Sequence, residues 1–232
     1  MTQLLQNCTL IIAAGGSGCR FGGNKLLASI GGMPVLAYSL LNLGKFFPVG
    51  NLILVAGKNS LEQYRQICQT YLPQNPVKII AGGAERSNSV LNGLQAVAAD
   101  MEFVAIHDAA RPLANIDLIT ASVELLQQNK TLHGVSAASK VVDTIKKVQS
   151  NLIVATVPRE DLWAMETPQT FRLSSLRQAY DALPPGITPT DDTAILAASG
   201  MNCAVLANRR CNRKITLPED LVLVENMLKK MS

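Results

Sequence analysis

The chain has 232 residues, of which 48% are hydrophobic, 16% are charged and 4% are aromatic, and its net charge is +4. This length suits a single α/β domain, and the apolar fraction allows a sizeable core. The modest charge and the few aromatic rings argue against a nucleic-acid-binding protein, which would gather basic and stacking side chains on one face. A small anionic ligand is the better expectation.

Short apolar runs alternate with amphipathic segments over the first 140 residues. Strands are predicted over residues 10–14, 52–56, 77–81, 103–107 and 135–138. Helices are predicted to begin near Pro34, Asn59 and Ser87, and a further helix over 116–126 has apolar residues at intervals of three and four. This order predicts a mostly parallel α/β sheet with helices on both faces, whose ligands bind at the carboxyl ends of the strands.

The pattern changes after residue 140. Residues 142–157 predict a β-hairpin that turns at 149–151. Because a lone two-stranded hairpin is only marginally stable, we expect a protruding arm that packs on a second chain. An edge hairpin of the main sheet is the alternative.

The C-terminal part returns to the mixed pattern. It predicts a helix over 173–183, a helix capped at 190–192, a strand over 204–207, and a last helix opened by a capping box of Thr216 and Glu219. We therefore expect one domain over residues 1–232 with a β-arm at about 140–160.

The cysteines and the apolar runs bear on the compartment. Five cysteines are odd in number and show no C-x-x-C spacing, namely Cys8, Cys19, Cys68, Cys203 and Cys211. They indicate neither a disulfide framework nor a zinc site, and they favour a reducing cytoplasmic location. No apolar run approaches ~18 residues, so no membrane span is expected. No basic flank precedes the first apolar run, so no signal peptide is expected.

A cationic, glycine-rich loop follows the first predicted strand directly. Its glycines, which let a backbone approach a ligand closely, are Gly15, Gly16, Gly18, Gly22 and Gly23. Arg20 and Lys25 add two charges. The loop fails the dinucleotide fingerprint because Phe21 holds the third glycine position, and it fails the P-loop pattern because Asn24 stands where Lys belongs. We interpret it as a polyphosphate-binding loop of another kind; a glycine-rich turn with surface charges is the alternative.

Two more polar segments follow predicted strands. Asp108 comes after the fourth strand and can hold a divalent cation or sugar hydroxyls, while Arg111 can grip a phosphate. An Asp108–Arg111 pair that only shapes the turn is the alternative. After the third strand, backbone groups at 82–83 with Ser89 can contact the edge of a base, unless Ser87 or Asn88 merely caps the next helix.

The remaining polar residues add cations and hydroxyls but no covalent nucleophile with its base. Lys214 closes a basic run over 208–214 and precedes Ile215, so we expect it to project inward. Cations, hydroxyls, glycine N–H groups and one carboxylate are the groups that phosphoryl or nucleotidyl transfer requires, since positioning and charge neutralisation carry that chemistry.

Eight motifs, taken in order, resemble those of the 2-C-methyl-D-erythritol 4-phosphate cytidylyltransferase family. They lie at residues 13–20, 24–26, 82–90, 107–112, 143–146, 167–171, 190–192 and 214–220. The resemblance implies a Rossmann-like nucleotidyltransferase fold with a protruding arm. It also implies transfer of a cytidylyl group from CTP to 2-C-methyl-D-erythritol 4-phosphate with Mg²⁺, in the non-mevalonate route to isoprenoids. Asn24 departs from the family, in which many members have Pro before the loop lysine.

The resemblance also implies roles for individual residues. The catalytic set is Arg20, Lys25, Lys214 and Asp108, and Asp108 would also lie near the metal. The CTP site would comprise Ala13, Ala14, Gly15, Gly16, Gly18, Gly82, Gly83 and Ser89. The acceptor site would comprise Arg111, Thr144, Arg159, Thr167 and Thr190. The arm would embrace a second subunit in a homodimer, so Thr144 and Arg159 serve either their own site or that of the partner.

Two other functions remain open from the residues. A cytidylyltransferase acting on a pentitol phosphate such as ribitol 5-phosphate would share the nucleotide loop and differ only in its acceptor pocket. A non-catalytic nucleotide-binding protein would share the fold, although the intact cation set argues against it.

Overall fold

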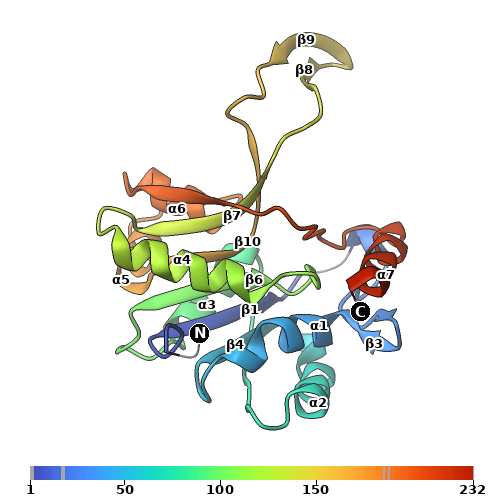
Figure 1. Cartoon of the computed structure of the whole chain (residues 1–232), viewed down its shortest axis with the longest axis vertical. Coiled ribbons are helices and arrows are strands. Elements are labelled where there is room, and N and C mark those ends of the chain that lie inside the picture. The colour runs from blue at the N-terminus through green and yellow to red at the C-terminus, as the bar shows by residue number, and fades with distance from the viewer. Residues whose placement is uncertain (1–2, 17–18, 185, 188, 232) are drawn as a thin grey trace.

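The computed structural model describes residues 3–16, 19–184, 186–187 and 189–231. Its centre is a seven-stranded sheet with the strand order β11-β7-β10-β6-β1-β4-β5 (Figure 1). These strands are β1 (Cys8–Ala14), β4 (Leu52–Ala56), β5 (Lys78–Ala81), β6 (Phe103–Asp108), β7 (Gly134–Lys140), β10 (Trp163–Arg172) and β11 (Cys203–Ala207). All run parallel except β10, which lies antiparallel between β6 and β7. The prediction of a mostly parallel α/β sheet is confirmed.

Helices cover both faces of this sheet. They are α1 (Val35–Asn42), α2 (Leu61–Tyr71), α3 (Arg86–Gln95), α4 (Ile116–Gln128), α5 (Leu173–Asp181), α6 (Asp192–Ala198) and α7 (Glu219–Met231). Short 3₁₀ turns form η1 (Cys19–Phe21), η2 (Gly44–Phe46) and η3 (Lys58–Ser60), and a two-residue ladder joins β2 (Ser29–Ile30) to β3 (Met33–Pro34). Among the described residues, no helix is long and apolar enough to cross a membrane.

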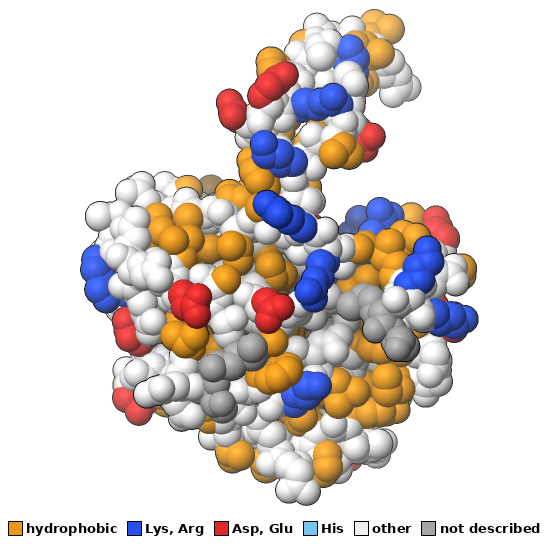
Figure 2. Space-filling model, in the orientation of Figure 1, with side chains coloured by type: hydrophobic (Ala, Val, Ile, Leu, Met, Phe, Trp, Pro, Cys, Tyr) orange, Lys and Arg blue, Asp and Glu red, His pale blue; other side chains and the backbone are white. Residues whose placement is uncertain are grey.

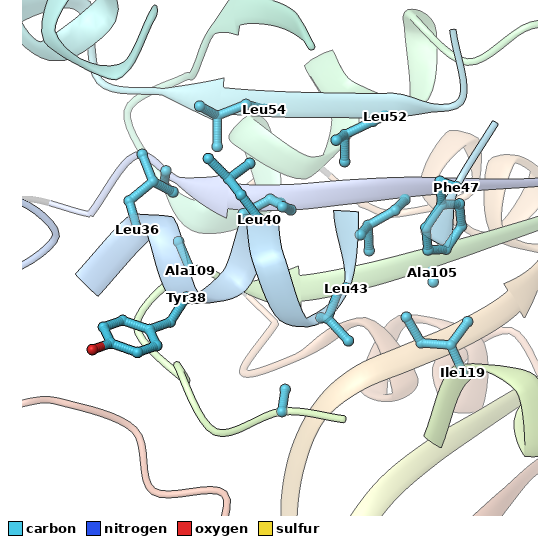
Figure 3. Close-up of a cluster of buried hydrophobic side chains, with 14 of the residues drawn as sticks. Leu36, Tyr38, Leu40, Leu43, Phe47, Leu52, Leu54, Ala105, Ala109 and Ile119 are labelled. Carbon is cyan, nitrogen blue, oxygen red and sulfur yellow. The ribbon is translucent and has the colours of Figure 1, made fainter. Parts of the chain in front are cut away.

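The two faces of the sheet bury separate apolar clusters because side chains alternate along each strand. Leu52 and Leu54 of β4 join the cluster beneath α1, where Leu36 and Leu40 pack toward them (Figure 3). Val55, one residue further along β4, joins the opposite cluster with α3, α5 and α6. Strands that are buried on both sides are apolar at almost every position, which is why the predicted apolar runs proved to be strands.

The strand β10 was missed by the sequence prediction. Its register shifts between Met165 and Gln169 in its pairing with β7, so the usual alternation of side chains is broken in mid-strand. Pro168 lies inside this irregular stretch, and a proline argues against a central strand. The sequence analysis therefore predicts no strand there, and only pairing with β6 and β7 reveals it.

The predicted hairpin is confirmed as a separate two-stranded unit. The strands β8 (Ile145–Gln149) and β9 (Leu152–Val157) pair only with each other, so the alternative of an edge hairpin is wrong. Ser150 and Asn151 form the turn with φ values of 47° and 64°, the left-handed pair that a tight hairpin needs. The hairpin stands well away from the sheet (Figure 1), with Leu152 and Ile153 exposed by 70% and 69%.

Capping was predicted correctly for α6 but not for α7. Asp191 is the N-cap of α6, and its side chain accepts a hydrogen bond from the backbone N–H of Ala194. At α7 the proposed box of Thr216 and Glu219 is wrong. The carboxylate of Asp220 instead accepts the backbone N–H groups of Thr216 and Leu217, because Asp220 is buried there while Glu219 points to solvent.

Candidate active site

The candidate site lies where β1 and β6 end side by side. Ala13 pairs with Asp108 in the parallel register of these strands, so the glycine loop and the Asp108 carboxylate emerge together. The strand order also reverses here, because β4 and β5 extend the sheet on one side of β1 and β6 lies on the other. Such a switch point is where ligands bind in parallel α/β sheets.

A cleft of about 400 Å³ opens at this point. Of the described residues that line it, four are cations and two are carboxylates. The lining comprises Ala13, Ala14, Gly15, Gly16, Arg20, Lys25, Leu26, Ala84, Glu85, Arg86, Ser89, Asp108, Ala110, Lys214 and Thr216. The excess of positive charge suits a polyanionic ligand.

Asp108 is the electrostatic centre of the cleft. Its Oδ2 lies 2.5 Å from Lys214 Nζ and its Oδ1 lies 3.3 Å from Arg86 Nε. Burial acts to raise the pKa of this carboxyl, but Lys214 and Arg86 outweigh burial and hold its pKa well below the ordinary value. Asp108 is therefore ionised at neutral pH and fixes two of the cleft cations.

Lys25 comes from the glycine loop and reaches the same place. Its ammonium donates a 2.7 Å hydrogen bond to the carbonyl oxygen of Ile215, next to Lys214. Partial burial lowers the pKa of Lys25, and the nearby charges of Lys214 and Arg20 lower it further. The positive charges of Lys25, Lys214 and Arg20 repel one another, and a bound polyphosphate would reduce this repulsion.

Asn24, where the chain departs from many relatives, anchors the loop that carries Lys25. Its Oδ1 accepts hydrogen bonds from Tyr64 Oη (2.9 Å) and from the backbone N–H of Leu26 (3.2 Å). Its Nδ2 donates to Ser60 Oγ at 3.1 Å. Side-chain bonds to the start of α2 thus fix this loop.

The segment that carries Lys214 has no regular secondary structure and depends on side-chain contacts. Asn212 Nδ2 donates to Glu166 Oε2 (3.0 Å) and to the carbonyl of Thr167 (2.8 Å), both on β10. Arg111 Nη1 donates to the carbonyl of Asn212 at 2.8 Å. The strand that the sequence did not predict therefore positions the Lys214 segment.

The predicted nucleobase side of the site lies at the start of α3. Ser89 Oγ accepts a hydrogen bond from the N–H of Gly83 (3.1 Å), and the N–H of Gly82 donates to the carbonyl of Ala56 (2.8 Å). A Cβ on Gly82 would lie only 2.7 Å from Ser89 Oγ, so a side chain there would displace the hydroxyl that accepts the N–H of Gly83. Ser87 and Asn88 are not the N-cap; Glu85 is, with Asn88 completing its capping box.

The structure gathers the catalytic set predicted from the sequence. Arg20, Lys25, Lys214 and Asp108 line one cleft with four of the predicted CTP residues of the first loop and Ser89. Gly82 and Gly83 lie just behind Ser89, and Gly18 lies outside the described residues. Direct contacts with a nucleotide stay a prediction for all of these.

The predicted acceptor residues do not gather in the same way. Thr144 and Arg159 lie on the arm, where Arg159 donates to the carbonyl of Val142, and Thr190 is exposed on the approach to α6. Thr167 Oγ1 accepts a hydrogen bond from the backbone N–H of Asp108 at 2.9 Å, so this hydroxyl helps to fix the backbone of Asp108. Arg111 holds the Lys214 segment. Acceptor contacts by these five residues stay a prediction.

Arg86 is a charged cleft residue that was not predicted from the sequence, and the alternative ion pair of Asp108 with Arg111 is wrong. Arg86 makes the ion pairs with Asp108 and with Asp192. Arg111 donates its backbone N–H to the Asp108 carbonyl at 3.0 Å, and its charge helps to lower the pKa of the Asp108 carboxyl, but the two side chains form no ion pair in the described part of the chain. A signal was present, because Arg86 is a cation at the start of the helix that follows the third predicted strand.

A Rossmann-like sheet whose strand ends carry a glycine loop, a cluster of cations and one ionised carboxylate is the architecture of a nucleotidyltransferase. The family model described as 2-C-methyl-D-erythritol 4-phosphate cytidylyltransferase matches residues 8–230, and the chain belongs to this family.

Individual members of this family are similar to the chain over nearly its whole length. The chain is 36% identical to the enzyme of that name from Halalkalibacterium halodurans, over 95% of this chain and 96% of that protein. It is 36% identical to the one from Alkaliphilus oremlandii, over 97% and 96% of the two chains. The solved structure of 4-diphosphocytidyl-2C-methyl-D-erythritol synthase from Anaerococcus prevotii superposes with a TM-score of 0.81 at 26% identity, covering 97% of this chain and 99% of that one.

Proposed function

We propose that this protein transfers the cytidylyl group of CTP to 2-C-methyl-D-erythritol 4-phosphate and releases pyrophosphate, a step of the non-mevalonate route to isoprenoid precursors. The observation that carries the proposal is the convergence of Lys25, Lys214, Arg86 and Arg20 around the ionised Asp108 at the switch point of the sheet. Family membership names the substrates.

The chemistry needs charge neutralisation more than proton transfer. A phosphate oxygen of the acceptor forms a bond to the α-phosphorus of CTP, and the bond from that phosphorus to the bridging oxygen breaks. Pyrophosphate leaves with the electron pair. Since the nucleophile is already an anion, no general base is required, and the barrier is the approach of two anions. Lys25 and Lys214 lower this barrier by neutralising charge on the α-phosphate.

The glycine loop and the start of α3 divide the binding of CTP between them. Gly15 and Gly16 let the backbone approach the triphosphate, with Arg20 and Lys25 as counter-charges. The N–H groups of Gly82 and Gly83 already donate within the protein. Their carbonyl oxygens therefore remain to accept hydrogen bonds from the cytosine amino group.

Magnesium fits this site as a metal held chiefly by substrate. The described residues contain no group of three or more His, Cys, Asp or Glu side chains suited to a metal ion, and Asp108 is the one carboxylate at the centre of the cleft. Mg²⁺ commonly takes one or two carboxylates together with substrate phosphates. Asp108 would supply that protein ligand, and the bound ion would add positive charge at the phosphates.

The arm supports a homodimer. Exposed apolar side chains at Val148, Leu152 and Ile153 stand on a hairpin that contributes nothing to the core, and Lys and Arg side chains lie along the arm and at its junction with the body (Figure 2). A second copy covering the apolar side chains would place Thr144 and Arg159 near an acceptor phosphate.

The described cysteines Cys8, Cys68, Cys203 and Cys211 are all free thiols, which agrees with a cytoplasmic location.

The test is pyrophosphate release from CTP and 2-C-methyl-D-erythritol 4-phosphate in the presence of Mg²⁺. Parallel reactions with ribitol 5-phosphate separate the two acceptors. Turnover with the pentitol phosphate alone would replace the proposed acceptor. Binding of CTP in calorimetry with no turnover on either acceptor would instead support a non-catalytic nucleotide-binding protein.

A further inference from the structure

Arg86 is held from two sides by carboxylates. Its Nε lies 3.3 Å from Asp108 Oδ1 in the cleft, and its Nη1 lies 2.9 Å from Asp192 Oδ2. Its backbone is fixed as well, because it is the first residue of α3 after the capping box of Glu85 and Asn88. A planar guanidinium suits such a bridge because its donors point in fixed directions.

Asp192 lies behind this arrangement and is fully buried. Its Oδ1 accepts a 2.7 Å hydrogen bond from Tyr180 Oη on α5, so one oxygen is fixed while the other faces Arg86. Asp192 does not line the cleft. Its ion pair with Arg86 links it to the reaction site.

These contacts form one continuous chain of a hydrogen bond and ion pairs. Tyr180 orients Asp192, Asp192 holds Arg86, Arg86 contacts one oxygen of Asp108, and Lys214 contacts the other oxygen at 2.5 Å. Because an arginine side chain has several rotatable bonds, Arg86 without its rear partner would sample other rotamers. The orientation of the Asp108 carboxylate would then be set by Lys214 alone.

We propose that Asp192 is a positioning residue for nucleotidyl transfer: from outside the cleft it holds Arg86 in the orientation that fixes Asp108 and, through it, Lys214. Asp192 would thereby affect the transition state without touching either substrate. The inference rests on the proposed function, since it assigns a role within that reaction.

The first test is Asp192→Asn, which keeps the shape of the side chain and an oxygen for Tyr180 but removes the charge opposite Arg86. We expect kcat to fall by about 10- to 100-fold, the size of loss that a small misplacement of catalytic groups causes. The KM for CTP should stay within about threefold of wild type, because the lost interaction acts mainly in the transition state.

Two companion variants separate positioning from a merely structural role. Arg86→Ala should show a similar loss, and the double variant with Asp192→Asn should be no slower than Arg86→Ala alone, since residues that act through one contact are not additive. Arg86→Lys keeps the charge but cannot span both carboxylates, so its kcat should fall by about 10-fold. It also serves as the test if Asp192→Asn does not fold.

Glu102→Gln is the matched control. It removes an acid from an ion pair with Arg172 (3.5 Å) at the opposite end of β6, and its kcat should equal that of wild type. Rates are normalised to the folded fraction measured by circular dichroism.

A folded Asp192→Asn or Arg86→Lys variant with kcat within about twofold of wild type would overturn the proposal, given the expected loss. Multiplying losses in the double variant would do the same. Failure of the wild-type protein to release pyrophosphate would instead overturn the proposed function.

Discussion

Replacing Lys214 by Gln separates catalysis from stability most cleanly. The change removes the ammonium that lies 2.5 Å from Asp108 Oδ2, while Arg86 remains at 3.3 Å from the other oxygen. If Lys214 neutralises the α-phosphate in the transition state, kcat should fall by about 10²–10³-fold, or about 2.7–4 kcal/mol.

The cost to folding should be smaller. The Lys214 side chain is 38% exposed but the Asp108 side chain only 11%, so solvent screens the pair in part, and Arg86 stays as a partner of Asp108. Loss of one partner of such a buried group costs about 1–3 kcal/mol. For a chain of this size, a loss of about 1 kcal/mol lowers Tm by roughly 2–4 °C. Out of a total stability of about 5–15 kcal/mol, this leaves the variant folded at 25 °C, and any loss of rate is then a loss of catalysis.

The assay is steady-state pyrophosphate release with both substrates saturating, alongside thermal unfolding of the same samples. Arg213→Gln is the matched control, because it removes a neighbouring cation that pairs with Asp220 at 2.9 Å instead of Asp108. It should retain wild-type kcat. The reasoning is refuted if folded Lys214→Gln keeps more than about a third of wild-type kcat, since the expected loss is at least about 10²-fold, or if Arg213→Gln loses as much.

Three other changes test separate parts of the structure. Because the pKa of Lys25 is lowered, its charge is lost at a lower pH than that of an ordinary lysine, so kcat should decline on the alkaline side and Lys25→Arg should move this decline to higher pH. Leu152→Asp places a charge on the exposed arm residue, and analytical ultracentrifugation should show a shift from dimer to monomer. Gly83→Ala places a Cβ 2.4 Å from the Cβ of Asn88, and it should destabilise the fold by about 1–3 kcal/mol in thermal or denaturant unfolding.

Each of these has its own control. An alkaline limb that stays in place in Lys25→Arg would assign the titration to another group. Val49→Asp changes an apolar residue that is 68% exposed but lies on the body, and it should leave the sedimentation of the protein unchanged; equal dissociation by both variants would argue against the arm as the interface. Gly23→Ala meets no atom within 4 Å, so its stability should match wild type, and a loss equal to that of Gly83→Ala would contradict the steric explanation.

The local sequence pattern was enough to predict the elements that have the same surroundings along their whole length. The strands β1 and β4 are buried on both faces, so their apolar runs identified them directly. The turn at Ser150 and Asn151 was also predictable, because left-handed backbone favours a small set of residues. The strand β10 was not, because its irregular register and Pro168 hide a strand that its neighbours impose.

The sequence by itself predicted which groups would carry the chemistry: a glycine loop with Arg20 and Lys25, an Asp at a strand end, and Lys214 in a basic run. Those are properties of residue type and of position relative to a strand, which local periodicity reveals. Only the tertiary structure decided which charges meet. Asp108 pairs with Arg86 and Lys214 and not with Arg111, and β10 and Asn212 hold the Lys214 segment. Ion pairing depends on distances of a few ångströms between segments that lie up to 106 residues apart, and only the folded sheet fixes those distances.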